Sequence, residues 1–208
     1  MNNYRPSTEI RNESYGQRGG SPVDQFGVWL SGRAIRRALG GRQGLEALDL
    51  GCGYHARLLR AIRPSLKTGT GVDLQISAEA RAEPDMHYLE STIEAALPQL
   101  ADAAFDLIMM TSVLEHLWQP GEALIHCRRL LKPDGILLVN VPTWRGKFFL
   151  EFSAFRLGTS PALEMDDHKM YYDKRDLWPL LVQAGFKPSR IHLKYHKFGL
   201  NLFATIRA

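Results

Sequence analysis

The chain has 208 residues, of which 45% are apolar and 23% are charged, as in an ordinary globular domain. No stretch approaches the roughly 20 apolar residues that cross a bilayer, and the N-terminus lacks an apolar signal region. We therefore expect neither a membrane span nor export. The two cysteines, Cys52 and Cys127, lie in a glycine turn and a predicted helix, so we expect no disulfide and a reducing cytoplasm.

The formal net charge of +4 is unevenly distributed. Residues 1–70 carry 11 Lys and Arg against 5 Asp and Glu, whereas the remainder carries 15 against 17. A basic half suits an acidic substrate, nucleic acid or an anionic membrane surface. Because these residues are spread over separate predicted elements, we favour a solvated surface, and nucleic acid is not excluded as a partner.

The N-terminal part is predicted to be an arm followed by a helix. Residues 1–20 show no apolar period, and we interpret them as a mobile arm or partial lid. Ser21 and Pro22 resemble a helix start, and Gly40–Gly41 ends the pattern. Between them apolar residues recur at near-helical spacing: Val23, Phe26, Leu30, Ala34 and Leu39. This helix is a plausible cover for a ligand cleft.

The next stretch, Asp49-Leu50-Gly51-Cys52-Gly53, closes a predicted buried strand over residues 45–50. An amphipathic helix follows, so the segment predicts the first strand–turn–helix unit of a nucleotide-binding sheet. Glycines let the backbone approach a ligand closely, and a helix N-terminus offers N–H donors to negative groups. Two glycines in one turn are weak evidence for a nucleotide site on their own, and the elements that follow strengthen this interpretation.

Strands and helices then alternate, which predicts an α/β fold with a mostly parallel sheet. The predicted strands are residues 67–74, 86–89, 105–110 and 136–141, with a turn at 132–135. The predicted helices are 92–100, 121–131 and 177–184, with a helical turn at 113–117. Residues 190–196 and 200–206 are joined by three residues that include Gly199, which predicts a C-terminal antiparallel pair.

Residues 143–172 interrupt this alternation, and we interpret them as an aromatic-rich insertion that selects the substrate. The rings would form an apolar pocket, a dimer contact, a membrane-facing patch or, most commonly, ordinary core packing. The insertion contains Trp144, Phe148, Phe149, Phe152, Phe155, Tyr171 and Tyr172. A helix is predicted over residues 147–156.

Six short motifs in this order resemble the class I S-adenosylmethionine-dependent methyltransferases. They are Asp49 to Gly53, Gly71-Val72-Asp73, residues 105–108, Leu114-Glu115-His116-Leu117, residues 131–135 and Ala184-Gly185-Phe186. The Glu-His pair is most similar to the branch containing ubiquinone-biosynthesis and other small-molecule methyltransferases. The last segment also resembles methyltransferases of bacterial surface-glycan pathways. The resemblance implies a Rossmann-like, doubly wound sheet within one methyltransferase domain, residues 21–208.

The resemblance implies a site for S-adenosyl-L-methionine, and the chemistry of two acids agrees with it. Asp73 stands at a strand end, where a carboxylate accepts from both ribose hydroxyls; a helix N-cap is its alternative role. Asp49 suits the cationic amino group of the cofactor, with a buried structural acid as the alternative. Further contacts implied by the resemblance are Gly51, Cys52, Gly53, Leu74, Thr111 and Glu115.

The sequence departs from the family pattern near the adenine. An acid is common after the third strand, but Thr92 occupies that position, where its hydroxyl would accept from the adenine amine and Ile93 would pack on the ring. A dehydrogenase is the natural rival for a glycine-turn α/β protein. It expects a third glycine where Ala56 stands, which favours the methyltransferase.

Methyl transfer to a hydroxyl requires in-line positioning and removal of a proton. The candidate bases are His116, after the fourth strand, and His168, in the insertion. A packed helix-start histidine is an equally strong interpretation of His116. Asp166, Asp167 and His168 have poor spacing for a closed metal site, so we expect no metal.

The sequence therefore predicts a cytoplasmic methyltransferase that acts on a small-molecule or glycan-type acceptor, at oxygen. The alternatives are a methyltransferase of nucleic acid or protein, and a non-catalytic nucleic-acid-binding protein that keeps the fold. Thr111-Ser112-Val113-Leu114 stands where an Asn-Pro-Pro-aromatic sequence would indicate amino-group methylation of bases. The oligomeric state is not predicted.

Overall fold

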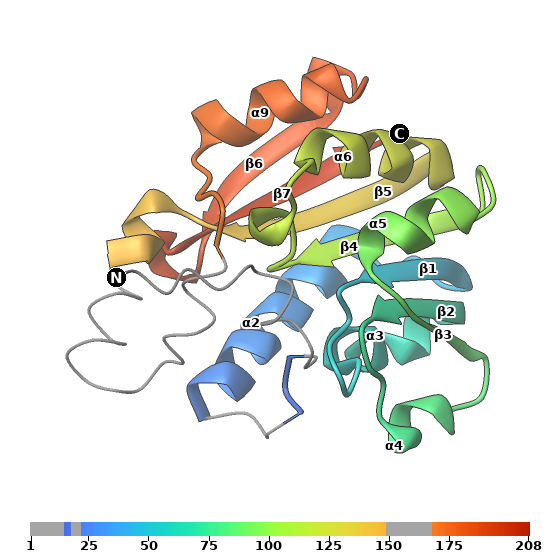
Figure 1. Ribbon diagram of the computed structural model, residues 1–208. Coiled ribbons are helices and arrows are strands. Elements are labelled where there is room, and N and C mark those ends of the chain that lie inside the picture. Colours follow the sequence, from blue (N-terminus) through green and yellow to red (C-terminus); the bar gives the residue numbers. More distant parts are fainter. Residues whose placement is uncertain (1–14, 18–21, 149–167) are drawn as a thin grey trace, which may run out of the picture.

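The computed structural model describes residues 15–17, 22–148 and 168–208, and its centre is a seven-stranded sheet in the order β3-β2-β1-β4-β5-β7-β6 (Figure 1). Strands β3, β2, β1, β4 and β5 are parallel, while β7 runs antiparallel to both β5 and β6. This confirms the predicted doubly wound sheet and its C-terminal antiparallel pair. The strands are β1 (Leu45–Leu50), β2 (Leu66–Asp73), β3 (Met86–Glu90), β4 (Phe105–Thr111), β5 (Leu131–Pro142), β6 (Ile191–His196) and β7 (Asn201–Arg207).

Helices cover both faces of the sheet, with α2 and α3 on one side and α5, α6 and α9 on the other (Figure 1). The α-helices are α2 (Pro22–Leu39), α3 (Arg57–Ala61), α4 (Ala78–Arg81), α5 (Ile93–Ala96), α6 (Pro120–Leu130) and α9 (Lys174–Gln183). Short 3-10 turns are η1 (Arg63–Ser65), η2 (Leu97–Gln99), η3 (Leu114–His116), η4 (Pro188–Arg190) and η5 (Lys197–Gly199). None of these described helices is long and apolar enough to cross a bilayer.

The central strands are apolar on both faces because each face packs against helices. Along β4, Leu107 and Met109 belong to the core beneath α2 and α3, while Ile108 and Met110 belong to the core beneath α6 and α9. Two layers of buried side chains thus hold the sheet rigidly in the middle of the domain. The carboxyl ends of β1, β2, β4 and β5 therefore meet at one fixed edge.

Two details differ from the sequence prediction. The predicted turn at residues 132–135 is a bulge within β5, because the pairing with β4 jumps from Leu131 to Ile136. The helical spacing also predicts the buried position of Leu39 in α2 correctly but that of Phe26 wrongly. Phe26 is 52% exposed and stacks on Trp29, whereas Ile35 and Leu39 face the core.

The predicted arm and insertion fall largely outside the described residues. The arm, residues 1–20, is described at residues 15–17 only. The insertion, residues 143–172, is described at its two ends, 143–148 and 168–172. Residues 144–148 are helical, in agreement with the start of the predicted helix. Phe149, Phe152 and Phe155 lie outside the described part of the chain.

Candidate functional site

The glycine turn after β1 is tied to the end of β2 by the Asp73 side chain. Its Oδ2 accepts a hydrogen bond from the Gly53 backbone N–H at 2.7 Å, and its Oδ1 accepts one from the Leu74 N–H at 2.8 Å. Asp73 does not cap α4, since Ser77 does so by accepting from the Ala80 N–H. The carboxylate is half-buried and retains lone pairs for ligand hydroxyls. The two motifs expected to share a site are therefore in direct contact.

The turn itself requires glycine. Gly51 and Gly53 have φ of 71° and 74°, which L-residues adopt only with strain. A Cβ on Gly51 would lie 2.3 Å from Val113 Cγ2 and 3.9 Å from Ile93 Cδ1. The loop after β4 and the start of α5 therefore close around the turn.

Asp49 is buried at the base of this turn, with 1% of its surface exposed. Burial raises the pKa of its carboxyl to about 8, and the nearby Asp73 carboxylate adds to the rise. Its Oδ2 has no hydrogen-bond partner among the described residues. Buried polar atoms rarely go without a partner, so this oxygen indicates a missing ligand group or water.

The other residues that were predicted to contact the cofactor differ in what their side chains touch. The Cys52 side chain packs into the core against Gly71, which leaves only its backbone to a ligand. Leu74, the first residue after β2, and Thr111, the last residue of β4, are both half-buried. The Thr92 hydroxyl caps α5 by accepting from the Ala95 N–H at 3.3 Å, so it already has a structural role.

A second group of predicted residues gathers after β4. Glu115 and His116 belong to η3, and His168 comes from the far end of the insertion. One donor atom from each of these three side chains lies within 4.8 Å of the others. The two imidazole rings are 4.7 Å apart, centroid to centroid, at 62°. The backbone joins the same segments, because the Lys169 N–H donates to the Glu115 carbonyl at 2.8 Å.

Two tyrosines support this group, and the sequence predicted neither role. The Tyr171 hydroxyl lies 3.1 Å from His168 Nδ1, and the two rings meet edge to face. Tyr172 is almost fully buried, and its pKa rises to about 12 through burial and the nearby Glu115 charge. A spacing of three residues between His168 and Tyr171 was the available signal, but their contact depends on the local chain path.

Tyr15 is a third residue whose role was not predicted. Its carbonyl accepts a hydrogen bond from the Tyr54 N–H at 2.9 Å and lies 3.2 Å from the position of a Cβ on Gly53. The described part of the arm therefore lies directly against the glycine turn. Residues 15–17 therefore contribute backbone contacts to the glycine turn.

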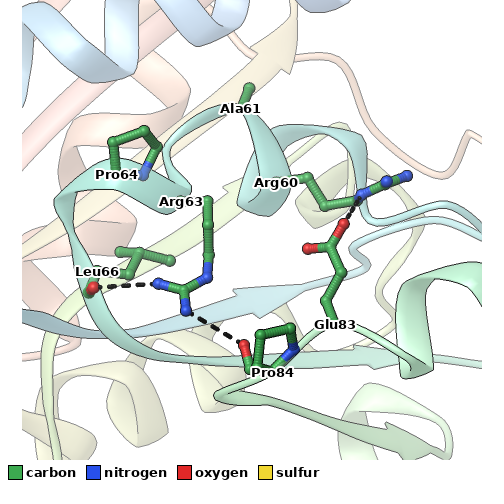
Figure 2. A pocket seen from close by; sticks show the side chains of 7 residues that line it. All are labelled: Arg60, Ala61, Arg63, Pro64, Leu66, Glu83 and Pro84. Carbon is green, nitrogen blue, oxygen red and sulfur yellow. Dashed lines mark hydrogen bonds and ion pairs between the residues drawn. The ribbon is translucent and has the colours of Figure 1, made fainter.

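A separate hollow lies at the opposite edge of the sheet, near the start of β2 (Figure 2). Its guanidinium groups are already occupied. Arg60 pairs with Glu83, while Arg63 donates to the carbonyl oxygens of Leu66 and Pro84 at 3.3 and 3.2 Å. Ligands of doubly wound sheets bind at the carboxyl ends of the strands, so the candidate site is at the glycine turn instead.

Comparison with known proteins identifies the family of the chain. A family model described as "Methyltransferase domain" matches residues 28–190. The chain is 34% identical over 116 residues to a ubiquinone biosynthesis O-methyltransferase from Paracidovorax citrulli, which covers 52% of this chain and 48% of that protein. It is 28% identical over 162 residues to a Mycolicibacterium smegmatis protein named "Probable S-adenosylmethionine-dependent methyltransferase", covering 76% of this chain and 58% of that one.

The fold has close solved counterparts as well. A S-adenosylmethionine-dependent methyltransferase from Archaeoglobus fulgidus superposes with a TM-score of 0.63 at 15% identity, over 92% of this chain and 96% of that chain. The chain spans about half the length of the curated relatives it matches. It belongs to the methyltransferase domain family, which confirms the resemblance seen in the sequence.

The residues present fit the cofactor that this family and fold bind, S-adenosyl-L-methionine. A cationic amino group suits the buried Asp49 oxygen that has no partner, and a ribose diol suits the acceptor lone pairs of Asp73. The glycine turn between them exposes its backbone to a ligand.

Proposed function

We propose that this chain transfers a methyl group from S-adenosyl-L-methionine to a hydroxyl of a small-molecule or glycan-type acceptor. The observation that carries the proposal is the contact between the Asp73 carboxylate and the glycine turn, next to the buried Asp49. The name of the Paracidovorax citrulli relative, an O-methyltransferase of ubiquinone biosynthesis, supports oxygen as the methylated atom. The free thiols of Cys52 and Cys127 support our expectation of a cytoplasmic protein.

In this proposal each strand end holds one part of the cofactor. Asp73 at the end of β2 binds the ribose hydroxyls, and Asp49 at the end of β1 binds the amino group. Gly51 and Gly53 bring the backbone close to the ligand, while Ile93 packs beside the adenine. Cys52, Leu74, Thr92, Thr111 and Glu115 are further proposed contacts. We place the acceptor over the ends of β4 and β5, next to the proposed cofactor site.

When bound, the cofactor supplies a methyl group on a sulfonium leaving group. The chain holds the acceptor oxygen in line with that methyl carbon and takes the hydroxyl proton. His116 and His168 lie together after β4, where the acceptor is expected, so the proton is removed at this pair. Held by Asp49, Asp73 and the glycine turn, the cofactor would supply the carbon of the new O–C bond and would retain the electron pair of its C–S bond.

The direct test is calorimetric titration of the full chain with S-adenosylmethionine. We expect Asp73→Ala to weaken binding at least about 100-fold, since it removes two proposed charge-assisted ribose contacts and the hydrogen bond from Gly53 that orders the turn. Asp102→Ala is the matched control, because that acid is exposed and pairs with Arg129 away from the site. Equal heats for wild type and Asp73→Ala would remove Asp73 from the cofactor site.

A further inference from the structure

The cluster formed by Glu115, His116 and His168 has the chemistry of a cation site. Sequence spacing alone argued against a metal, because His168 stands beside two acids that follow one another directly. The fold gives His168 different neighbours. It brings this residue next to Glu115 and His116, which stand more than 50 residues earlier in the chain. The resulting donors are two imidazoles and one carboxylate, within 4.8 Å of one another.

Donor atoms of these types bind particular metal ions. Two histidines and one carboxylate with open positions bind Zn²⁺ in hydrolases and Fe²⁺ in oxygenases. Bonds of about 2.0–2.2 Å to zinc place neighbouring donors roughly 3–3.5 Å apart, so the present spacing needs only side-chain closure. Glu115 is 1% exposed, whereas both histidines are half-buried. The cluster is therefore anchored on its inner side and accessible on the other.

The surroundings resemble those of metal ligands. The Tyr171 hydroxyl lies 3.1 Å from His168 Nδ1 and fixes the orientation of this ring, as outer hydrogen bonds do for metal-bound histidines. The hydrogen bond from Lys169 N–H to the Glu115 carbonyl locks the two segments at the level of the backbone.

We propose that Glu115, His116 and His168 bind one divalent transition-metal ion, of which Zn²⁺ is the test case. This deepens the proposed function, and only its catalytic consequence rests on that function. An acceptor hydroxyl bound to the ion has a lowered pKa, so its proton leaves to water and its oxygen is the nucleophile for the methyl carbon. The two histidines then act as ligands of the ion, in place of the proton-accepting role proposed for them above, and the ion activates the hydroxyl.

The experiment measures metal binding by the full chain without cofactor or acceptor. Chelator-treated protein is titrated with Zn²⁺ by calorimetry and with Co²⁺ by its visible absorption. We expect one equivalent to bind, with an absorption typical of nitrogen and oxygen ligands. Affinity should fall at least about tenfold in His168→Ala and Glu115→Gln, and about 10–100-fold in Tyr171→Phe.

The control is His87→Ala, which removes an exposed histidine on β3, outside the cluster. Circular dichroism of each variant separates metal loss from misfolding, and Glu115→Gln preserves side-chain size at the buried position. The proposal would be overturned if the wild-type chain bound no Zn²⁺, or if wild type and His168→Ala bound it with equal affinity. Titration with S-adenosylmethionine in the same samples tests the cofactor site separately, so each failure is recognisable.

Discussion

Asp49 is held neutral at physiological pH by its surroundings. Its side chain is buried, and the Asp73 carboxylate nearby disfavours a second negative charge, so its pKa rises to about 8. A cation that enters the site would favour the ionised form of this carboxyl. The acid is therefore set to ionise when a positively charged group approaches it.

The raised pKa of Asp49 predicts how stability depends on pH. The unfolded chain loses this proton near its ordinary pKa of 3.8, whereas the folded chain keeps it up to about 8. Between these values the folded state binds more protons, so the free energy of unfolding falls as the pH rises. We expect Asp49→Asn to melt several degrees above wild type at pH 8 and close to it at pH 4.5. Thermal unfolding at both pH values measures this, and a pH-independent difference would contradict it.

The position of the two acids beside the glycine turn could be predicted from the sequence, because it follows from local order along the chain. An acid before a glycine turn and an acid at the next strand end must meet, since parallel strands present their carboxyl ends together. The contacts of His168 and Tyr15 were beyond prediction. They depend on how the insertion and the arm return to the sheet edge, and neither segment has a repeating pattern that fixes its path.

At the level of elements, the turn between β1 and α3 depends on packing against the loop after β4. Gly51 has a positive φ, and Val113 fills the space where its Cβ would stand. This contact links the cofactor turn to η3, which begins one residue after Val113 and carries Glu115 and His116. The glycine turn and the segment that carries Glu115 and His116 are thus in contact through Val113.

Gly51→Ala tests that point of contact. We expect a loss of roughly 2–5 kcal/mol of unfolding free energy, combining left-handed strain with overpacking against Val113, and loss of cofactor binding. Gly121→Ala is the control, because nothing lies within 4 Å of its Cβ position at the start of α6. Denaturant unfolding of both variants gives the comparison. Equal stability of Gly51→Ala and wild type would show that the turn relaxes freely.

The sequence predicted elements best where burial dictates the residue pattern. The central strands read as continuous apolar runs because helices cover both their faces, and β1 matches its predicted bounds. The buried face of α2 was not predictable in the same way. Aromatic residues such as Phe26 fit the helical period equally well, and only the position of the helix over the sheet decides which side is covered.

For the whole molecule, a cofactor bound between the ends of β1 and β2 stabilises every element packed on them. S-adenosylhomocysteine at about 100 times its Kd should add about 2.7 kcal/mol, which for a domain of this size raises Tm by about 5–10 °C. Asp73→Ala should show no such rise, while Asp102→Ala should match wild type. A Tm that does not respond to the ligand in wild type would contradict the proposed site.

Residues before position 149 and after position 167 are hydrogen-bonded to the sheet edge or to segments beside it. On the N-terminal side, the Thr143 N–H and hydroxyl donate to the Leu200 and Gly199 carbonyls, and Gly146 packs so closely on the Leu200 carbonyl that no larger residue fits. On the C-terminal side, Lys169 bonds to Glu115, and the Tyr172 N–H donates to Pro142. These bonds are made by backbone groups and by small residues, so they set where the chain leaves the sheet edge at Gly146 and where it returns at Lys169.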